Sequence, residues 1–195
     1  MNKKNVALLL FDDVEVLDFA GPFEVFSVTS ELNDYSLFNV YTVASEKRPI
    51  IARNGLSVNP DYAVTECPRP DIIIVPGGNG TRQVMHAPVL LEWVGGQSRQ
   101  AELTLSVCTG SLVLAAAGLL KGLAATTHHE VFDLFRQVAP DTELKETDRF
   151  VDNGKIITAG GISAGIDMSL YVIERLLGAE QARQTAAYME YGDWR

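Results

Sequence analysis

Short runs of consecutive apolar residues, each closed by polar or turn-forming residues, recur along the chain. Runs of this length that hardly alternate are typical of strands buried on both faces, as in a parallel sheet. The clearest runs are residues 6–11, 71–75 and 103–107, and residues 38–44 form a looser one. Residues 149–158 predict a hairpin that turns at Asn153-Gly154.

Helical patterns separate these runs. In the first, Pro22 favours Gly21 over Asp18 as the cap, because a proline four residues past the cap removes a helix bond. In the fifth, Ser163 is expected as the N-cap and Gly178 as the residue after the last turn. The predicted helices are residues 23–32, 88–100, 109–119, 130–138, 164–177 and 179–190.

The alternation of strands and helices predicts an α/β fold with a parallel sheet covered on both faces. The connections are short, so we expect residues 1–195 to form one domain. Hydrophobic residues make up 47% of the 195 residues and charged residues 21%. This is the composition of a packed core that needs no disulfide or metal to hold it.

Charge and apolar run length exclude several classes of partner. With 16 Lys and Arg against 25 Asp and Glu, the net charge is −9, so we expect no nucleic-acid and no membrane-surface binding. No apolar run reaches the ~18 residues of a membrane span. The N-terminal pattern lacks a signal peptide, so a cytoplasmic location with reduced thiols is expected.

Polar or glycine-rich segments follow five of the predicted strand segments. Since ligands of open α/β sheets bind beyond the carboxyl ends of the strands, these segments are expected to share one rim. They carry Asp18, Pro76–Gly80, Cys108–Ser111, His128 and Gly160–Ser163.

Cys108 is the central candidate at this rim. It stands at a strand-to-helix junction with Gly110 two residues on, so a tight turn would present its sulfur above the sheet as a nucleophile. We expect the helix N-terminus to lower the pKa of the thiol. The alternative is a buried structural cysteine. Cys67 precedes its strand, roughly 16 Å from the rim, so we expect it to be structural and unpaired with Cys108.

Asp18 is the candidate acid and base. A carboxyl group held against a thiolate has a raised pKa and can then exchange a proton, whereas the alternative is an ordinary cap or loop aspartate. The N–H groups of Gly77 and Gly78, with that of Thr109, suit an anion hole, although many glycine pairs are plain turns.

The histidines give a weaker signal. His128 and His129 are adjacent and cannot both face one pocket if the chain is extended there, so a structural or hydrogen-bonding role is the default. His86 is expected on the surface. The spacing of histidines and cysteines does not suit a metal site, and no nucleotide-binding glycine motif is present.

Several segments together resemble the ThiJ/PfpI superfamily, and within it the isonitrile (isocyanide) hydratase group. The nucleophile region is similar over Val107–Leu112, Ala116–Gly122 and Ala125–His128, and the acid region over Leu17–Val25. Val75–Gly78 and Gly160–Asp167 match as well. The motifs extend over nearly the whole chain.

The resemblance implies a flavodoxin-like three-layer sandwich with a mainly parallel sheet, related to class I glutamine amidotransferases and usually a homodimer. It implies Cys108 as nucleophile, Asp18 as its acid and base, and Thr109 beside them. Gly78 belongs to the implied anion hole, with His128 and Ile162 at the substrate pocket. No cofactor and no metal are required.

The implied reaction is the addition of water to a small-molecule isocyanide, giving an N-substituted formamide through a Cys108 thioimidate. Thr109 stands where peptidase-like members carry histidine, which argues against that activity. His129 replaces an aromatic residue of the hydratases, and the chain stops at Arg195, before their C-terminal end. Both departures concern the identity of the substrate more than the mechanism.

Two other functions stay open. One is another cysteine-dependent hydrolase or lyase reaction on a small electrophile. The other is a non-catalytic sensor in which Cys108 is oxidised or lines a ligand pocket. Similar domains head some AraC-like regulators, but no helix-turn-helix follows in this acidic sequence, so we expect no regulator function from it.

Overall fold

The computed structural model describes residues 3–192. Within them, a central sheet of seven strands has the order β10-β11-β7-β6-β1-β2-β5, and neighbouring strands are parallel except at the β10–β11 edge. Two short two-stranded sheets accompany it, β3–β4 and β8–β9. The strands are β1 (Lys4–Leu9), β2 (Phe38–Ala44), β3 (Ile50–Ile51), β4 (Ser57–Val58), β5 (Tyr62–Ala63), β6 (Ile72–Val75), β7 (Leu103–Val107), β8 (Ala124–Ala125), β9 (Glu143–Leu144), β10 (Phe150–Asp152) and β11 (Ile156–Ala159).

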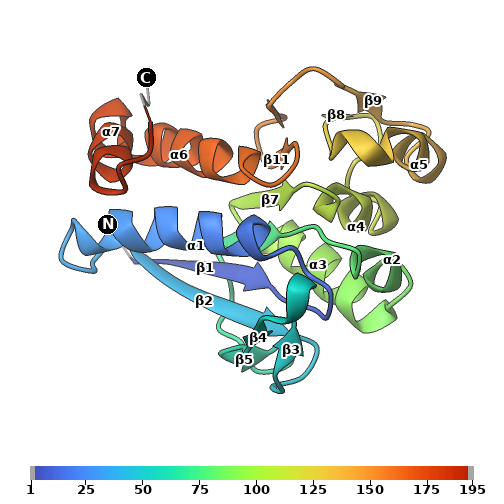
Figure 1. Ribbon diagram of the computed structural model, residues 1–195, viewed down its shortest axis with the longest axis horizontal. Coiled ribbons are helices and arrows are strands. Elements are labelled where there is room, and N and C mark those ends of the chain that lie inside the picture. The colour runs from blue at the N-terminus through green and yellow to red at the C-terminus, as the bar shows by residue number, and fades with distance from the viewer. Residues whose placement is uncertain (1–2, 193–195) are drawn as a thin grey trace.

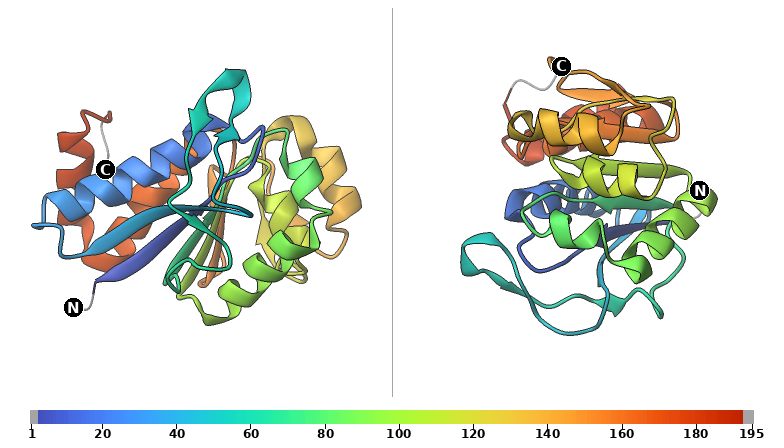
Figure 2. Two further views of the ribbon diagram at one scale, coloured as in Figure 1. Left: turned by 90° about the horizontal axis from the view of Figure 1, so that it is seen from below. Right: turned by 90° about the vertical axis from the view of Figure 1, so that its right-hand side faces the viewer.

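Helices cover both faces of the sheet, which gives three layers (Figure 1; Figure 2, left). Helices α1, α6 and α7 pack together on one face, and α2 to α5 lie on the other. The helices are α1 (Val16–Glu31), α2 (Thr81–Val84), α3 (Pro88–Gln100), α4 (Gly110–Ala116), α5 (Phe132–Val138), α6 (Ala164–Leu177) and α7 (Ala179–Tyr188), with 3₁₀ turns at Arg53–Gly55 and His129–Val131.

The central strands are buried on both faces. Every residue of β6, β7 and β11 is buried, and so are the last four residues of β1. This explains why β1 and β6 are nearly continuous apolar runs, whereas in β7 the buried Thr104 and Ser106 alternate with the apolar residues. The α/β class and the parallel sheet predicted from these runs are confirmed. Within residues 3–192, no helix combines the length and apolar character needed to cross a bilayer.

Helix α1 begins earlier than the sequence predicts. Its N-cap is Glu15, so Asp18 lies in the first turn and Pro22 lies inside the helix. The predicted start after Gly21 is therefore wrong. The proline costs one backbone hydrogen bond, but residues on both sides of it, including Phe19 and Val25, are buried in the core. Packing of the whole helix outweighs that local cost.

Smaller differences concern element ends. The strand predicted at residues 6–11 ends at Leu9, and the helix predicted at 109–119 covers only Gly110–Ala116. Ser163 stands at the N-cap of α6 without a side-chain capping bond, while Gly178 follows its last turn with φ 96° as predicted. The β10–β11 hairpin is present, but at its tip only Gly154 has positive φ.

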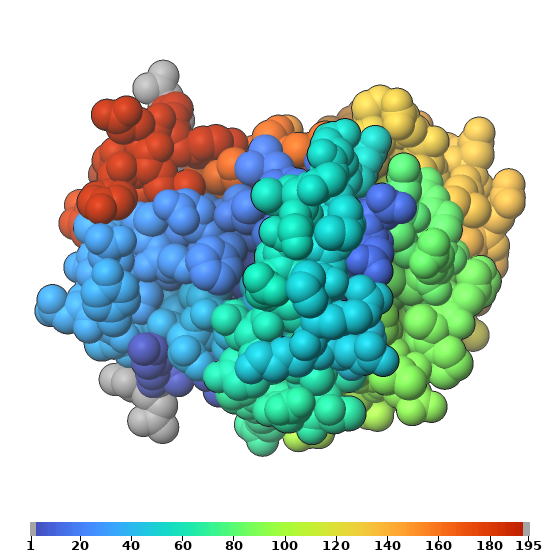
Figure 3. Space-filling model, turned by 60° about the horizontal axis from the view of Figure 1, so that its bottom comes forward, coloured from blue at the N-terminus to red at the C-terminus, as the bar shows by residue number. Residues whose placement is uncertain are grey.

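A small hairpin overhangs the carboxyl-end rim of the sheet. It comprises β3, the Arg53–Gly55 turn and β4, and it is bound to the loop after β1. The N–H of Asp13 donates to the carbonyl of Ile51 (2.8 Å), and the N–H of Arg53 donates to that of Val14 (2.9 Å). In the space-filling view this hairpin belongs to the cyan ridge across the front face (Figure 3). The loop that leads to Asp18 is thereby held in place.

Candidate active site

Cys108 occupies a sharp turn between β7 and α4. Its φ is +56°, a left-handed conformation that is unusual for a non-glycine residue and marks local strain. The turn is fixed from three sides: the Cys108 N–H donates to Ala159 (3.1 Å) and Gly160 (2.9 Å), and its carbonyl accepts from the Thr127 hydroxyl (3.1 Å). The strand-to-helix turn expected from the sequence is therefore present.

Close packing behind the turn explains why Gly110 follows. A Cβ atom on Gly110 would lie 2.0 Å from the carbonyl oxygen of Val75, at the end of the neighbouring strand β6. Any side chain there would push α4 away from the sheet and move Cys108 with it.

Ile162 is a second strained residue beside the thiol. Its φ is +50°, which is costly for a β-branched side chain. In this conformation its backbone N–H interacts with both Asp18 and Cys108, and it lowers the pKa of each group. Two strained turns, one after β7 and one after β11, therefore meet at the same pair of side chains.

Asp18 is buried and only partly paired. Its Oδ2 accepts the N–H of Gly77 (2.9 Å), whereas its Oδ1 has no hydrogen-bond partner within residues 3–192. Burial raises the pKa of Asp18 to about 7, opposed by the Gly77 N–H, and the charge of Glu15 adds to the increase. The raised pKa expected from the sequence is confirmed, but burial rather than a neighbouring thiolate is its largest cause.

The Cys108 thiol shows the opposite of the expected shift. It is only 6% exposed, and burial followed by the charge of Asp18 raises its pKa to about 12. The prediction of a lowered pKa is therefore wrong. The N–H groups of Thr109 and Ile162 favour the thiolate, but their effect is smaller than the cost of burying a charge next to a carboxylate.

The N–H groups of Gly77 and Gly78 already donate hydrogen bonds to side chains of the protein. Gly77 donates to Asp18, and Gly78 donates to the Thr109 hydroxyl (2.9 Å). The Thr109 hydroxyl in turn donates to the Gly78 carbonyl (3.1 Å), which ties this loop to the turn at Cys108. The arrangement therefore differs from the open anion hole predicted, and the N–H groups that reach the thiol are those of Thr109 and Ile162.

His128 and His129 both line the pocket, contrary to the expectation for an extended chain. A 3₁₀ turn begins at His129, and the two rings stack with centroids 4.4 Å apart. Burial lowers the pKa of His128, so its ring is neutral at pH 7. Its Nδ1 accepts the N–H of Glu130 (3.3 Å), which leaves the proton on Nε2.

These segments enclose a cavity of about 300 Å³ over the thiol. Of the residues predicted from sequence, Gly78, Cys108, Thr109, His128 and Ile162 line it, while Asp18 and Gly77 lie beneath the surface. Two further lining residues, Asn79 in the predicted Pro76–Gly80 segment and His129, were already singled out in the sequence. The sequence reasoning missed the others, which are Glu15, Arg53, Arg82, Glu130 and Val131.

Two of the missed residues, Arg82 and Arg53, differ in how far the sequence indicates their place at the pocket. Arg82 follows the predicted Pro76–Gly80 loop by two residues, so its position near the rim could have been inferred. Arg53 reaches the pocket only because the β3–β4 hairpin folds back over the rim, and it pairs there with Glu15 (3.1 Å). Nothing local in the sequence indicates that contact.

The remaining candidates lie elsewhere. Cys67 is half-buried between β5 and β6, and neither cysteine forms a disulfide. His86 is exposed, as expected. Across residues 3–192, no group of three or more His, Cys, Asp and Glu side chains is placed to hold a metal ion.

Known proteins resemble this chain over nearly its full length. The model of the DJ-1/PfpI family matches residues 4–175. The chain is 37% identical to isonitrile hydratase of Pseudomonas putida over 186 residues, which is 95% of this chain and 78% of that protein. It is 30% identical to the HTH-type transcriptional regulator GbdR of Pseudomonas aeruginosa over 92% of this chain but only 48% of the regulator.

A solved structure shares the fold. The crystal structure of a THiJ/PfpI family protein from Pseudomonas syringae superimposes with a TM-score of 0.88 at 28% identity, covering 100% of this chain and 78% of that one. This solved structure therefore shares the architecture of the chain. The chain belongs to the DJ-1/PfpI family.

Proposed function

We propose that the protein is a hydratase that adds water to an isocyanide and releases an N-substituted formamide. The observation that carries the proposal is the buried Asp18–Cys108 pair, which meets beneath one cavity in a chain 37% identical to an isonitrile hydratase. The two groups shift each other's pKa, so a proton can pass between them during the reaction.

The first step forms a covalent bond to sulfur. Above pH about 7 the pair carries one proton and one negative charge, because Asp18 has the lower pKa of the two. Cys108 sulfur adds to the electrophilic isocyanide carbon, and the shared proton is delivered to that carbon. The product is a neutral thioimidate, and Asp18 is left as a carboxylate.

The second step consumes water. Asp18 takes a proton from a water molecule while the oxygen of that water adds to the thioimidate carbon. Asp18 passes that proton to the nitrogen. The carbon–sulfur bond then breaks, the hydroxyl proton returns to the Asp18–Cys108 pair, and the N-substituted formamide leaves. The pair again holds one proton and one negative charge, so no cofactor and no metal enters the balance.

The testing experiment follows formamide release from an aryl isocyanide. We expect Cys108→Ala to lower the rate by at least about 1,000-fold and Asp18→Asn by about 100-fold, since one removes the nucleophile and the other the proton carrier. Cys67→Ala is the matched control and should keep the wild-type rate. Full turnover by Cys108→Ala contradicts the mechanism.

A second candidate is a ligand-sensing domain without turnover. The observation that favours it is the 30% identity to a transcriptional regulator over 92% of the chain. In that case the wild type binds a small molecule in the Cys108 cavity but releases no formamide and turns over no other electrophile. The homodimer and cytoplasmic location expected from the sequence stay predictions.

A further inference from the structure

The Cys108 cavity contains one cation that no carboxylate neutralises. Arg53 pairs with Glu15 at 3.1 Å, and the nearest partner of Glu130 is the neutral His128 ring at 3.9 Å. Arg82 also lines the cavity, and within residues 3–192 it forms no ion pair. A guanidinium stays charged at any pH of interest, so this wall of the cavity carries a permanent positive charge.

The position of the Arg82 side chain is fixed by the loop that borders the thiol. Its Nη1 donates to the carbonyl of Gly78 (3.3 Å) and to the hydroxyl of Thr81 (3.2 Å). Gly78 is itself bonded to Thr109, the residue after Cys108. The Nε and Nη2 groups of Arg82 have no acceptor within the described part of the chain, so they remain available to a ligand.

We propose that Arg82 makes this cavity selective for substrates that carry a carboxylate at the end opposite the electrophilic carbon. The inference rests on the proposed function, and the substrate class is an isocyanide with a carboxylate on its far end. A planar guanidinium binds a carboxylate through two parallel hydrogen bonds, which also fixes the orientation of the substrate. The electrophilic carbon then lies toward Cys108 while the carboxylate lies toward Arg82.

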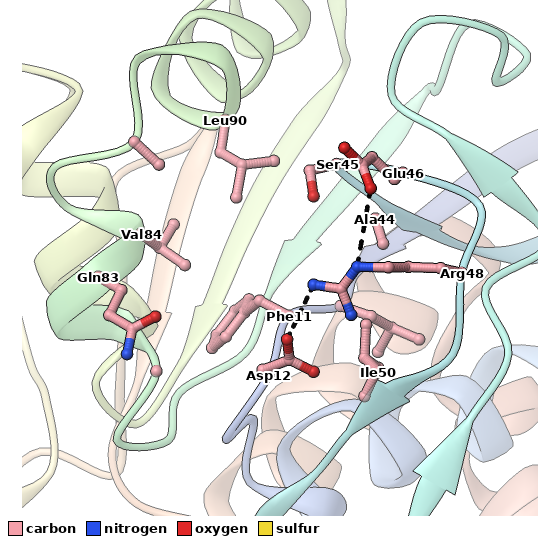
Figure 4. A pocket seen from close by; sticks show the side chains of 13 residues that line it. Phe11, Asp12, Ala44, Ser45, Glu46, Arg48, Ile50, Gln83, Val84 and Leu90 are labelled. Carbon is pink, nitrogen blue, oxygen red and sulfur yellow. Dashed lines mark hydrogen bonds and ion pairs between the residues drawn. The ribbon is translucent and has the colours of Figure 1, made fainter.

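The size of the cavity agrees with this class. A cavity of about 300 Å³ stands at the lower end of the roughly 300–1,000 Å³ range of ligand pockets, so it suits a single ring or short chain. Another rim cavity also contains an arginine, Arg48, but that guanidinium is bound to Asp12 and lies beside Glu46 (Figure 4). Of these two cavities, only the Cys108 cavity combines a nucleophile with an uncompensated cation.

The experiment compares two substrates of the same size, 4-isocyanobenzoate and the uncharged 4-isocyanobenzamide. The ratio of their kcat/KM values is measured for the wild type and for Arg82→Gln, so that intrinsic reactivity cancels. We expect the ratio to fall by about 10- to 100-fold in Arg82→Gln, because a charge-assisted hydrogen bond to the carboxylate is lost. Arg82→Lys should retain part of the preference.

Arg99→Gln is the matched control. Arg99 is also exposed, but it lies on α3 against Leu91 and Glu92, in a different pocket, and its replacement changes the net charge by the same amount. The ratio should stay at its wild-type value in this variant. An equal fall in Arg99→Gln and Arg82→Gln would assign the effect to overall charge and overturn the proposal.

A binding measurement separates this proposal from the proposed function. Cys108→Ala is titrated with 4-formamidobenzoate and with 4-formamidobenzamide, with and without Arg82→Gln. Tighter binding of the carboxylate that depends on Arg82 supports the proposal even where no isocyanide is turned over. Turnover of both isocyanides at equal efficiency, unchanged by Arg82→Gln, overturns the proposal and leaves the hydratase function standing.

Discussion

Two cavities lie at the same rim of the sheet, and their charged groups are arranged in opposite ways. The Arg48 cavity, of about 160 Å³, borders the ends of β1 and β2 and has Arg48 held by Asp12 (3.0 Å) and near Glu46 (3.7 Å) at exposed positions (Figure 4). In the Cys108 cavity, Asp18 and Cys108 lie beneath the surface with no cation paired to either within residues 3–192.

The pKa shifts of two aspartates express this difference. The N–H of Ile51 and the guanidinium of Arg48 lower the pKa of Asp12, whereas burial raises that of Asp18 to about 7. Both carboxyls follow or flank the end of β1, only six positions apart in the chain. A place at the carboxyl ends of the strands therefore does not by itself raise the pKa of a carboxyl group; burial without a counter-charge does.

The largest expected effect is on the pH dependence of stability. Because the folded-state pKa of Asp18 is raised, the stability that Asp18 contributes is fully present below the unfolded pKa of 3.8. This stability is lost as pH rises through about 7. Relative to Asp18→Asn, the wild type should lose up to about 4 kcal/mol of unfolding free energy between pH 4 and pH 8. Urea unfolding at several pH values measures this difference.

Asp12→Asn is the control that tests the comparison. The pKa of Asp12 is lowered, so its contribution is present above its unfolded pKa and is lost as pH falls through the folded value. The two variants should therefore diverge from the wild type with opposite signs of pH dependence. The same sign for both would mean that the two carboxyls do not differ in the way described.

An intermediate effect is expected from Gly161→Ala. A Cβ atom there would lie 2.3 Å from Cδ2 of His128, so the ring must move and the wall of the Cys108 cavity changes shape. We expect kcat/KM for an aryl isocyanide to fall by about 10-fold. At Gly160 the nearest atom would be 3.5 Å away, so Gly160→Ala is the matched control. An equal loss in both variants would assign the effect to the backbone instead of to His128.

The smallest effect is expected from Arg48→Met. The two ion pairs that it removes are exposed, with the arginine side chain 53% accessible, so the midpoint of urea unfolding should stay at its wild-type value. Turnover of an aryl isocyanide should stay at the wild-type rate. A strong loss of turnover would show that the Arg48 cavity is coupled to the reaction through the loop after β1.

Local pattern was sufficient for the architecture and for the position of the thiol. The apolar runs at β1 and β6 predicted buried parallel strands because a strand covered on both faces has no polar side to alternate with. Cys108 was located by its place between such a strand and Gly110, since a sharp turn needs a residue that allows the helix to approach the sheet. The carboxyl ends of parallel strands meet at one rim, so Asp18 could be expected near it.

Long-range packing decided the extent of α1, the position of Arg53 and the pKa values at the site. Helix α1 extends through Pro22 because the residues on both sides of the proline are buried. Arg53 precedes Cys108 by 55 positions, and the β3–β4 hairpin brings it over the rim. The pKa values of Asp18 and Cys108 depend on how completely neighbouring elements exclude water from them. The sequence by itself determined that Asp18 and Cys108 lie near one rim. Only the tertiary structure decided that Arg53 joins them and that Asp18 and Cys108 are buried, because both features depend on residues distant in the chain.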